Sequence, residues 1–382
     1  MRMTWRHLST LAVASALLVL GTALAGCSDD DAPDPTPAAS SQATSGATPE
    51  TTTPAEIPVT NAPTGPVTFD VLAGSTEGNK DVEAFMPADI RVRAGDSIRW
   101  TSHGFEGHTI TFGNGDDTLA SLGDYLLPNP ANPDERIFNP RLALASEKQG
   151  THDGTTEWIN SGFFGVPAAQ DYTLTFTKEG LYTYLCLVHP FTMTGTVTVE
   201  PPGARVDSPE TVSARGDALA AQYFDELAGE AKRLDEAAYS APGPNGSTIH
   251  YVQVGAITDH GQVAIYIPGA LDIAPGDTVI FQNDDRNFHN VIFRGNRELP
   301  SGIGIIPDPE GRGLNFSLDN ASAIAVDPPP GGFDDQTFLS SGSLGVLQPR
   351  LTWTLRFDKP GTYVYACTIH VLGGMAGAIN VR

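Results

Sequence analysis

Two short loops of this chain each combine a cysteine, a histidine and a methionine. They are "YLCLVHPFTMTG", with Cys186, His189 and Met193, and "YACTIHVLGGMAG", with Cys367, His370 and Met375. Thiolate, imidazole and thioether groups are ligands for soft and borderline metal ions, so their clustering indicates a transition-metal site. The chain has only three cysteines, and two of them stand in these loops.

The two loops belong to a repeat in which matching residues lie 181 positions apart. The matched pairs are His108 and His289, Cys186 and Cys367, and His189 and His370. The strand-like segments "TLTFTKEGLYTYLC" and "TLRFDKPGTYVYAC" align at the same offset. Internal similarity over this length predicts a duplicated domain.

Each copy alternates apolar and polar residues between turn signals, as in "IRVRAGDSIRW" from Ile90 to Trp100. This period of two predicts short antiparallel strands packed as a β-sandwich. Between the copies the apolar spacing becomes helical. We therefore predict a helix from about 209 to 238, with Ser208 as the N-cap and Pro209 in the first turn.

The N-terminus predicts export from the cytoplasm. A basic start precedes an apolar run from Leu11 to Leu24, which is short for a membrane span and typical of a secretory signal peptide. The run ends in "LAGC", which resembles a bacterial lipobox and marks Cys27 as the lipidated residue. The alternative is an ordinary signal peptide followed by an unrelated cysteine. The expected location is the bacterial cell envelope, with a lipid anchor in the membrane.

These features predict five regions. They are a signal peptide at 1–26, a disordered tether at 27–66, a first sandwich at 67–200, a helical linker at 201–247 and a second sandwich at 248–382. The tether has almost no large apolar residues and cannot offset its chain entropy by burial. The net charge of −23 argues against nucleic acid as a partner, because binding to phosphates needs a basic surface.

Each copy resembles a cupredoxin, the blue-copper family of plastocyanin, amicyanin and azurin. The C-x2-H-x4-M spacing from Cys367 to Met375 matches plastocyanin's loop, and the first copy has one residue fewer between His189 and Met193. The spacing from Trp100 to His108 is similar to amicyanin's. The resemblance implies an all-β fold of two tandem Greek-key β-sandwiches joined by the helical linker.

The resemblance also implies one type 1 copper site in each copy. The implied ligands are His108, Cys186, His189 and Met193 in the first copy, and His289, Cys367, His370 and Met375 in the second. Independently, two imidazoles and a thiolate with a weak thioether suit both oxidation states of copper. In related cupredoxins an asparagine after the upstream histidine holds the cysteine loop. Asn290 matches it, and Thr109 stands at that place in the first copy.

Two other uses of Cys186 and Cys367 are possible. Cys186 and Cys367 could form a disulfide or be inert buried thiols, but neither use explains the histidines and methionines in both copies. Zinc is disfavoured because methionine is a poor zinc ligand. The histidines without a counterpart in the other copy are expected on the surface or in loops. They are His103, His152, His250 and His260.

The predicted function is electron transfer between a redox protein donor and a redox protein acceptor. Multicopper oxidases and copper nitrite reductases need His-x-His pairs or a histidine beside the cysteine, and the sequence has neither. We therefore do not expect an enzyme. The alternative is copper binding, trafficking or resistance, but such proteins tend to use methionine-rich and histidine-rich segments, and this chain has five methionines in all.

Overall fold

The computed structural model describes most of the chain after residue 64. The described ranges are 65–104, 106–113, 123–165, 169–237, 240–283, 288–345 and 350–382. The predicted signal peptide, Cys27 and the tether up to residue 64 lie outside the described residues. Within these ranges no helix is both long enough and apolar enough to cross a membrane.

The first copy folds into two β-sheets that share one apolar core. The alternation seen in the sequence becomes an alternation of faces: Ile98 and Trp100 are fully buried, while Arg99 between them is exposed. One sheet has the order β2 (Lys80–Met86), β1 (Thr68–Glu77), β4 (Ser97–His103), β10 (Asp171–Phe176) and β8 (Thr151–His152). The other has the order β3 (Asp89–Arg93), β12 (Thr194–Glu200), β11 (Gly180–Leu185), β5 (Thr111–Phe112) and β9 (Ile159–Asn160).

The second copy repeats this arrangement around its own core. One sheet has the order β15 (Gly261–Ile267), β14 (Thr248–Thr258), β17 (Asp277–Asn283) and β25 (Thr352–Phe357), and β13 (Ser240–Pro242) pairs with β14. The other has the order β16 (Ala270–Ile273), β27 (Ala376–Val381), β26 (Gly361–Ala366), β19 (Ile292–Phe293), β23 (Leu339–Ser341) and β22 (Ala325–Val326). A short pair, β18 (Phe288–His289) and β24 (Leu344–Gly345), completes the copy. The predicted fold class is confirmed.

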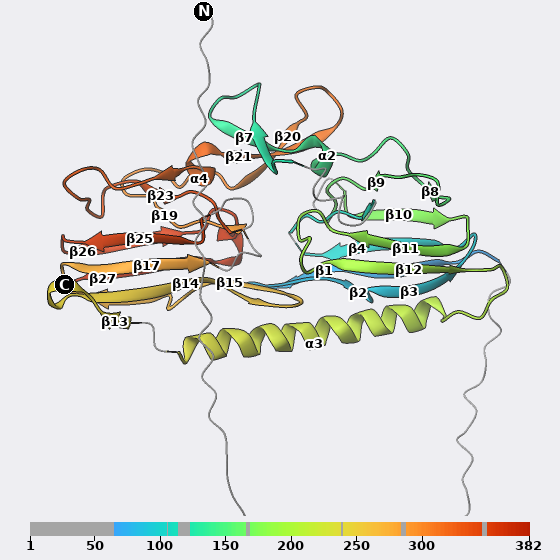
Figure 1. Cartoon of the computed structure of the whole chain (residues 1–382), viewed down its shortest axis with the longest axis horizontal. Coiled ribbons are helices and arrows are strands. Elements are labelled where there is room, and N and C mark those ends of the chain that lie inside the picture. The colour runs from blue at the N-terminus through green and yellow to red at the C-terminus, as the bar shows by residue number, and fades with distance from the viewer. Residues whose placement is uncertain are drawn as a thin grey trace, which may run out of the picture. The chain divides into compact units, whose positions relative to one another are not determined.

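The two copies share one continuous sheet, because β2 pairs antiparallel with β15 (Figure 1). Asp81 faces Gln262, and these two residues hold matching positions in the repeat. On either side, Lys80 pairs with Val263 and Val82 pairs with Gly261. Lys80 matches Gly261 in the repeat and Val82 matches Val263, so the repeat converts each of these pairs into the other. Equivalent strands therefore meet around an approximate two-fold axis, as they do in an isologous dimer.

A second shared sheet forms from the long segments between the upstream histidines and the cysteines. Its order is β20 (Ile303–Pro307), β21 (Leu314–Asp319), β7 (Glu135–Phe138) and β6 (Leu126–Pro128), so each copy contributes two strands. Short helices follow at matching places, α2 (Pro140–Ala143) and α4 (Asn320–Ala323). Phe163 and Phe316 pack ring to ring beside this sheet, with centroids 4.2 Å apart. The segments thus lie over the sandwiches and also join them.

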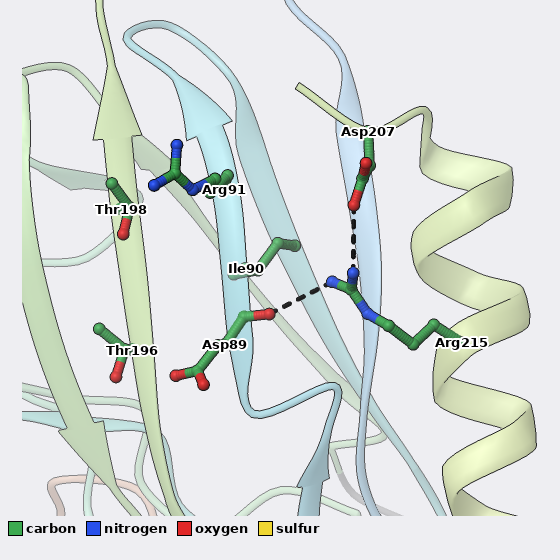
Figure 2. A pocket seen from close by; sticks show the side chains of 7 residues that line it. All are labelled: Asp89, Ile90, Arg91, Thr196, Thr198, Asp207 and Arg215. Atoms are coloured by element: carbon green, nitrogen blue, oxygen red, sulfur yellow. Dashed lines mark hydrogen bonds and ion pairs between the residues drawn. The ribbon is translucent and has the colours of Figure 1, made fainter. Parts of the chain in front are cut away.

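The predicted linker helix is α3 (Pro209–Asp235), and it packs across the sheet that both copies share. Ser208 caps its N-terminus by accepting a hydrogen bond from the Thr211 amide at 3.3 Å. Near this end Arg215 binds the Asp207 carboxylate at 3.1 Å and donates to the Asp89 carbonyl at 3.3 Å, and these three residues line a small surface pocket (Figure 2). The helix buries Leu227 against apolar residues of β2 and β15, so it braces the junction between the copies.

Candidate metal centres

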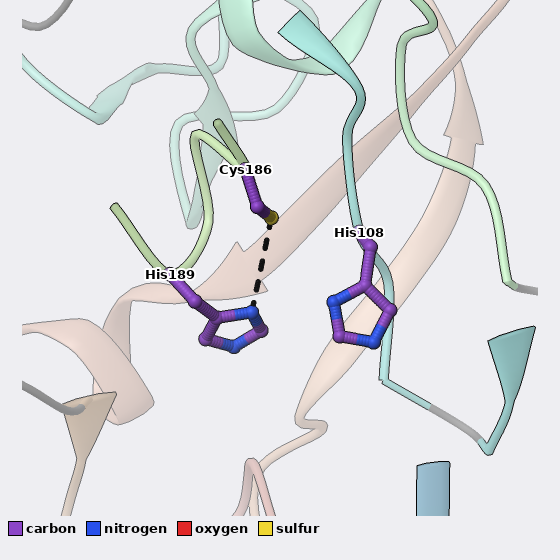
Figure 3. Close-up of side chains that lie close together, drawn as sticks. All are labelled: His108, Cys186 and His189. Carbon is purple, nitrogen blue, oxygen red and sulfur yellow. Dashed lines mark hydrogen bonds between the residues drawn. The ribbon is translucent and has the colours of Figure 1, made fainter. Parts of the chain in front are cut away.

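The first centre brings together three residues from two segments of the sandwich (Figure 3). His108 is held by a pair of 2.9 Å backbone hydrogen bonds with Phe164. Cys186 follows the end of β11, and His189 lies on the loop that leads to β12. The ligand atoms of the three residues lie within 4.8 Å of one another, and Cys186 Sγ is 3.8 Å from His189 Nδ1.

The second centre has the same construction. His289 lies in β18, Cys367 follows β26, and His370 lies on the next loop. Cys367 Sγ is 3.9 Å from His289 Nδ1 and 3.5 Å from His370 Nδ1. Both cysteines are free and fully buried, each in the core of its own sandwich, so they do not form the disulfide considered as an alternative.

Backbone hydrogen bonds fold each methionine back toward its cysteine. The Cys186 amide donates to the Met193 carbonyl at 2.9 Å, and the Cys367 amide donates to the Met375 carbonyl at 3.1 Å. Both methionines are fully buried in the same core clusters as the cysteines. The longer second loop takes up its extra residue in a short 3-10 turn, η2 (Val371–Gly373). The structure therefore brings all four residues of each predicted ligand set to one end of a sandwich.

A glycine makes room for each upstream histidine. Gly74 and Gly255 occupy matching positions where the pairing of β1 with β2, and of β14 with β15, shifts register. Their φ angles are 78° and 82°, and a side chain at either position would overlap the ring of His108 or His289. Only glycine adopts this backbone readily and leaves that space. Both glycines share the 181-residue offset, so the repeat could have identified them.

The residue after each upstream histidine ties down the cysteine loop, with different chemistry in the two copies. The Thr368 amide donates to Asn290 Oδ1 at 2.9 Å, while in the first copy the Leu187 amide donates to the Thr109 hydroxyl at 2.8 Å. The Thr109 amide also donates to Cys186 Sγ at 3.3 Å. Such supporting hydrogen bonds orient ligands and tune the metal they hold.

The donor atoms are prepared for a metal cation. Burial by itself would raise the pKa of the Cys186 thiol, but contacts with His108 and His189 lower that pKa well below its ordinary range. The Cys367 thiol is shifted in the same direction, since His289 and His370 outweigh its burial. His108 Nδ1 is buried, and no hydrogen-bond partner for it lies among the described residues. A low-pKa thiol and an imidazole nitrogen without a partner fit a bound copper ion.

Three acidic residues of the first copy lie beside the centres, and no motif in the sequence indicates them. Glu83 and Asp81 are almost fully buried on β2, and Glu106 lies between β4 and His108. Glu106 Oε2 is 3.2 Å from His189 Nε2, and its Oε1 is 2.9 Å from His370 Nε2. Burial alone would raise the pKa of Glu106, but hydrogen bonds from the two imidazoles lower it well below its usual range.

The other histidines in the part of the chain that the structure describes take no part in either centre. His250 contacts Asp277 at 3.2 Å, and His260 contacts Glu226 at 2.8 Å. His152 does not lie on the surface as expected. It lies in β8, which pairs with β10 at the edge of a sheet. Its ring packs against Tyr182, with ring centroids 4.6 Å apart, and the residue is 5% exposed.

Comparison with known proteins places both copies in one group. A family model described as copper binding proteins of the plastocyanin/azurin family matches residues 72–200 and again residues 252–382. The two matched ranges contain all eight predicted ligands and exclude the helix between the copies.

Individual relatives match a stretch of this chain that is about as long as one copy. Plastocyanin of Vicia faba is 25% identical over 117 residues, which is 31% of this chain and 87% of that protein. A putative pseudoazurin of Rhizobium leguminosarum bv. viciae is 28% identical over 117 residues, or 31% of this chain and 50% of that protein. Among solved structures, oxidised plastocyanin from Dryopteris crassirhizoma is 20% identical, with a TM-score of 0.19, and covers 35% of this chain and 99% of its own.

Proposed function

Because the chain belongs to the plastocyanin/azurin family of copper-binding proteins, we propose that it carries electrons one at a time through two type 1 copper sites. One observation supports this most: each sandwich holds a buried His–Cys–His cluster, with a buried methionine on the same loop. Copper bound by such a donor set changes its oxidation state by one electron.

The protein's own contribution is a ligand set that is already in place. The loop hydrogen bonds fix the cysteine relative to the methionine, and Asn290 or Thr109 fixes the residue after the cysteine. The sandwich holds the upstream histidine on a different segment. Little of this framework has to move when an electron arrives or leaves, which favours rapid electron transfer over catalysis.

Burial of the ligands favours a carrier over a copper-trafficking protein. The most exposed ligand, His189, is only 8% exposed, and the cysteines and methionines are fully buried. A protein that hands copper to another needs donors that an incoming ligand can reach. Electron transfer needs only a short distance to the partner.

We further propose that the chain works outside the cytoplasm of a bacterium, anchored to the membrane through a lipid on Cys27. A redox protein donor and a redox protein acceptor complete the pathway. Phe191 and Leu372 lie close in sequence to the ligands His189 and His370 and are 60% and 86% exposed. Exposed apolar residues so near the ligands offer contact points for such partners.

The proposal is tested by removing one thiolate at a time. The wild-type chain should bind two copper ions, show thiolate-to-copper absorption and take up two electrons reversibly. Cys186→Ser and Cys367→Ser should each bind one type 1 copper, lose one of the two absorption bands and take up one electron. Each variant is the matched control for the other. If either variant keeps both bands, the ligand assignment is wrong.

A further inference from the structure

The two centres face each other across the junction between the copies. In the first copy His189 turns Nδ1 toward Cys186 and Nε2 toward Glu106. In the second copy His370 turns Nδ1 toward Cys367 and Nε2 toward the same carboxylate. One side chain therefore contacts the outer nitrogen of a predicted ligand in each copy.

The contact distances favour two hydrogen bonds. Each Nε2 lies opposite a different oxygen of Glu106, at 3.2 Å for His189 and 2.9 Å for His370. When Nδ1 of a ring binds a metal, Nε2 of the neutral ring carries the proton and donates. A carboxylate has enough lone pairs to accept both hydrogen bonds, and hydrogen bonds to a charged acceptor are the stronger kind.

Two other described groups near the rings, those of Glu83 and Gln262, lie farther from the Nε2 atoms than Glu106 does. Glu83 Oε1 is 3.9 Å from His189 Nε2, beyond hydrogen-bond distance. The Gln262 amide nitrogen is 3.4 Å from His370 Nε2, a longer contact than the one made by Glu106. His108, two residues after Glu106, is held to Phe164 by paired backbone hydrogen bonds.

We propose that Glu106 is a positioning residue that couples the two metal centres by accepting a hydrogen bond from His189 and from His370. The inference rests on the proposed function. The bridge supplies a connected route from Cys186 through His189, Glu106 and His370 to Cys367. Along this route two links are hydrogen bonds, and the others are covalent bonds or would be bonds to the metal.

Electron exchange along this route conserves both electrons and protons. One electron leaves one centre and enters the other, so one is oxidised as the other is reduced. Both Nε2 protons stay in place, and no further reactant is needed. The His189 and His370 rings are 8% and 7% exposed, so the junction that connects them also keeps an external partner from touching them directly. The negative charge of Glu106 stabilises the more positive, oxidised form of both centres.

The test compares Glu106→Gln with Glu83→Gln in the full chain loaded with copper. Glu106→Gln has almost the same shape but loses the charge and retains only one oxygen. Nitrogen-15 NMR of the diamagnetic, fully reduced protein should show both ring Nε2–H signals displaced. Both reduction equilibria should shift about tenfold toward the reduced form, or about 59 mV for a one-electron couple. The rate of electron exchange between the centres after rapid photoreduction should fall. Glu83→Gln should leave the His370 signal in place.

The outcomes separate the inference from the function on which it rests. If the wild type shows no reversible one-electron steps, the proposed function fails. If these steps are present but Glu106→Gln moves the signal or the potential of one centre only, or of neither, the bridge is refuted. A third bound metal that both glutamine variants lose would also refute it, because Glu83, Glu106 and His189 would then be ligands. If Glu106→Gln does not fold, Glu106→Asp takes its place. This variant retains the charge on a shorter side chain, so at least one of the two Nε2–H signals should shift.

Discussion

Asp308 shows how a single buried charge is held in the second copy's long segment. Its side chain is fully buried in the turn between β20 and β21, where Arg312 Nε donates to it at 2.9 Å and the Glu310 amide at 3.1 Å. The Arg312 guanidinium lowers the pKa of Asp308 from 3.8 to about 2. The ionised carboxylate is therefore part of the folded turn.

We predict that Arg312→Gln lowers stability in a pH-dependent way. A carboxylate whose pKa is lower in the folded state adds stability above its unfolded pKa, and this stability is lost as the pH falls through the folded value. The difference in urea midpoint between wild type and Arg312→Gln should be constant above about pH 5 and should shrink between about pH 4 and about pH 2.

The control for this prediction is Arg356→Gln. Arg356 contacts Asp358 at 2.9 Å, but both side chains are more than half exposed. Exposed ion pairs contribute little, so this variant should show almost no pH-dependent difference. Equal behaviour of the two variants would contradict the role given to the buried carboxylate.

At the scale of elements, α3 approaches β2 closely at one glycine. A Cβ atom at Gly216 would lie 2.6 Å from the Met86 carbonyl oxygen, whereas one at Gly229 would meet nothing within 4 Å. Both glycines lie within the same helix, so they experience the same helix propensity in different surroundings.

We predict opposite effects for the two alanine variants. Gly229→Ala should raise the free energy of unfolding by about 0.5–1 kcal/mol, because alanine is the better helix former. Gly216→Ala should lower it by roughly 1 kcal/mol net, since overpacking costs about 1–3 kcal/mol and outweighs the same helical gain. Denaturant unfolding of both variants measures the difference. A stabilised Gly216→Ala would show that the helix can move away from β2 at no cost.

The elements also show what the sequence could predict. The sandwich strands and α3 follow from alternation and apolar spacing along the chain, and the eight predicted ligands follow from the repeated Cys-His-Met loops together with the resemblance to cupredoxins. The junction between the copies could not be predicted in this way. Asp81 and Gln262 meet through the pairing of strand edges, and Glu106 contacts His370 across 264 residues of sequence. At the position matching Glu106 the second copy has Asn287, so the repeat gave no signal for the carboxylate. The burial of His152 could not be predicted, because its neighbours in the sequence resemble those of a loop residue.

For the molecule as a whole, we predict that Cys27→Ser moves the protein from the membrane fraction to the soluble fraction without changing its copper sites. A multiply acylated cysteine binds a membrane firmly, and serine at this position cannot be lipidated in the same way. Fractionation of cells expressing wild type and variant provides the measurement, with Cys186→Ser as the control that should stay in the membrane. A variant that remains membrane-bound would point to an uncleaved apolar segment as the anchor.

The approximate two-fold axis through Asp81 and Gln262 has a consequence that depends on both copies being in one polypeptide. In a dimer of identical chains, any residue near the axis occurs twice, so a bridging carboxylate would face its own duplicate and the two negative charges would repel. Fusion into one chain removes that constraint: Glu106 occurs once, and one acid serves both sides. It also makes assembly independent of protein concentration, because neither half can be diluted away from the other.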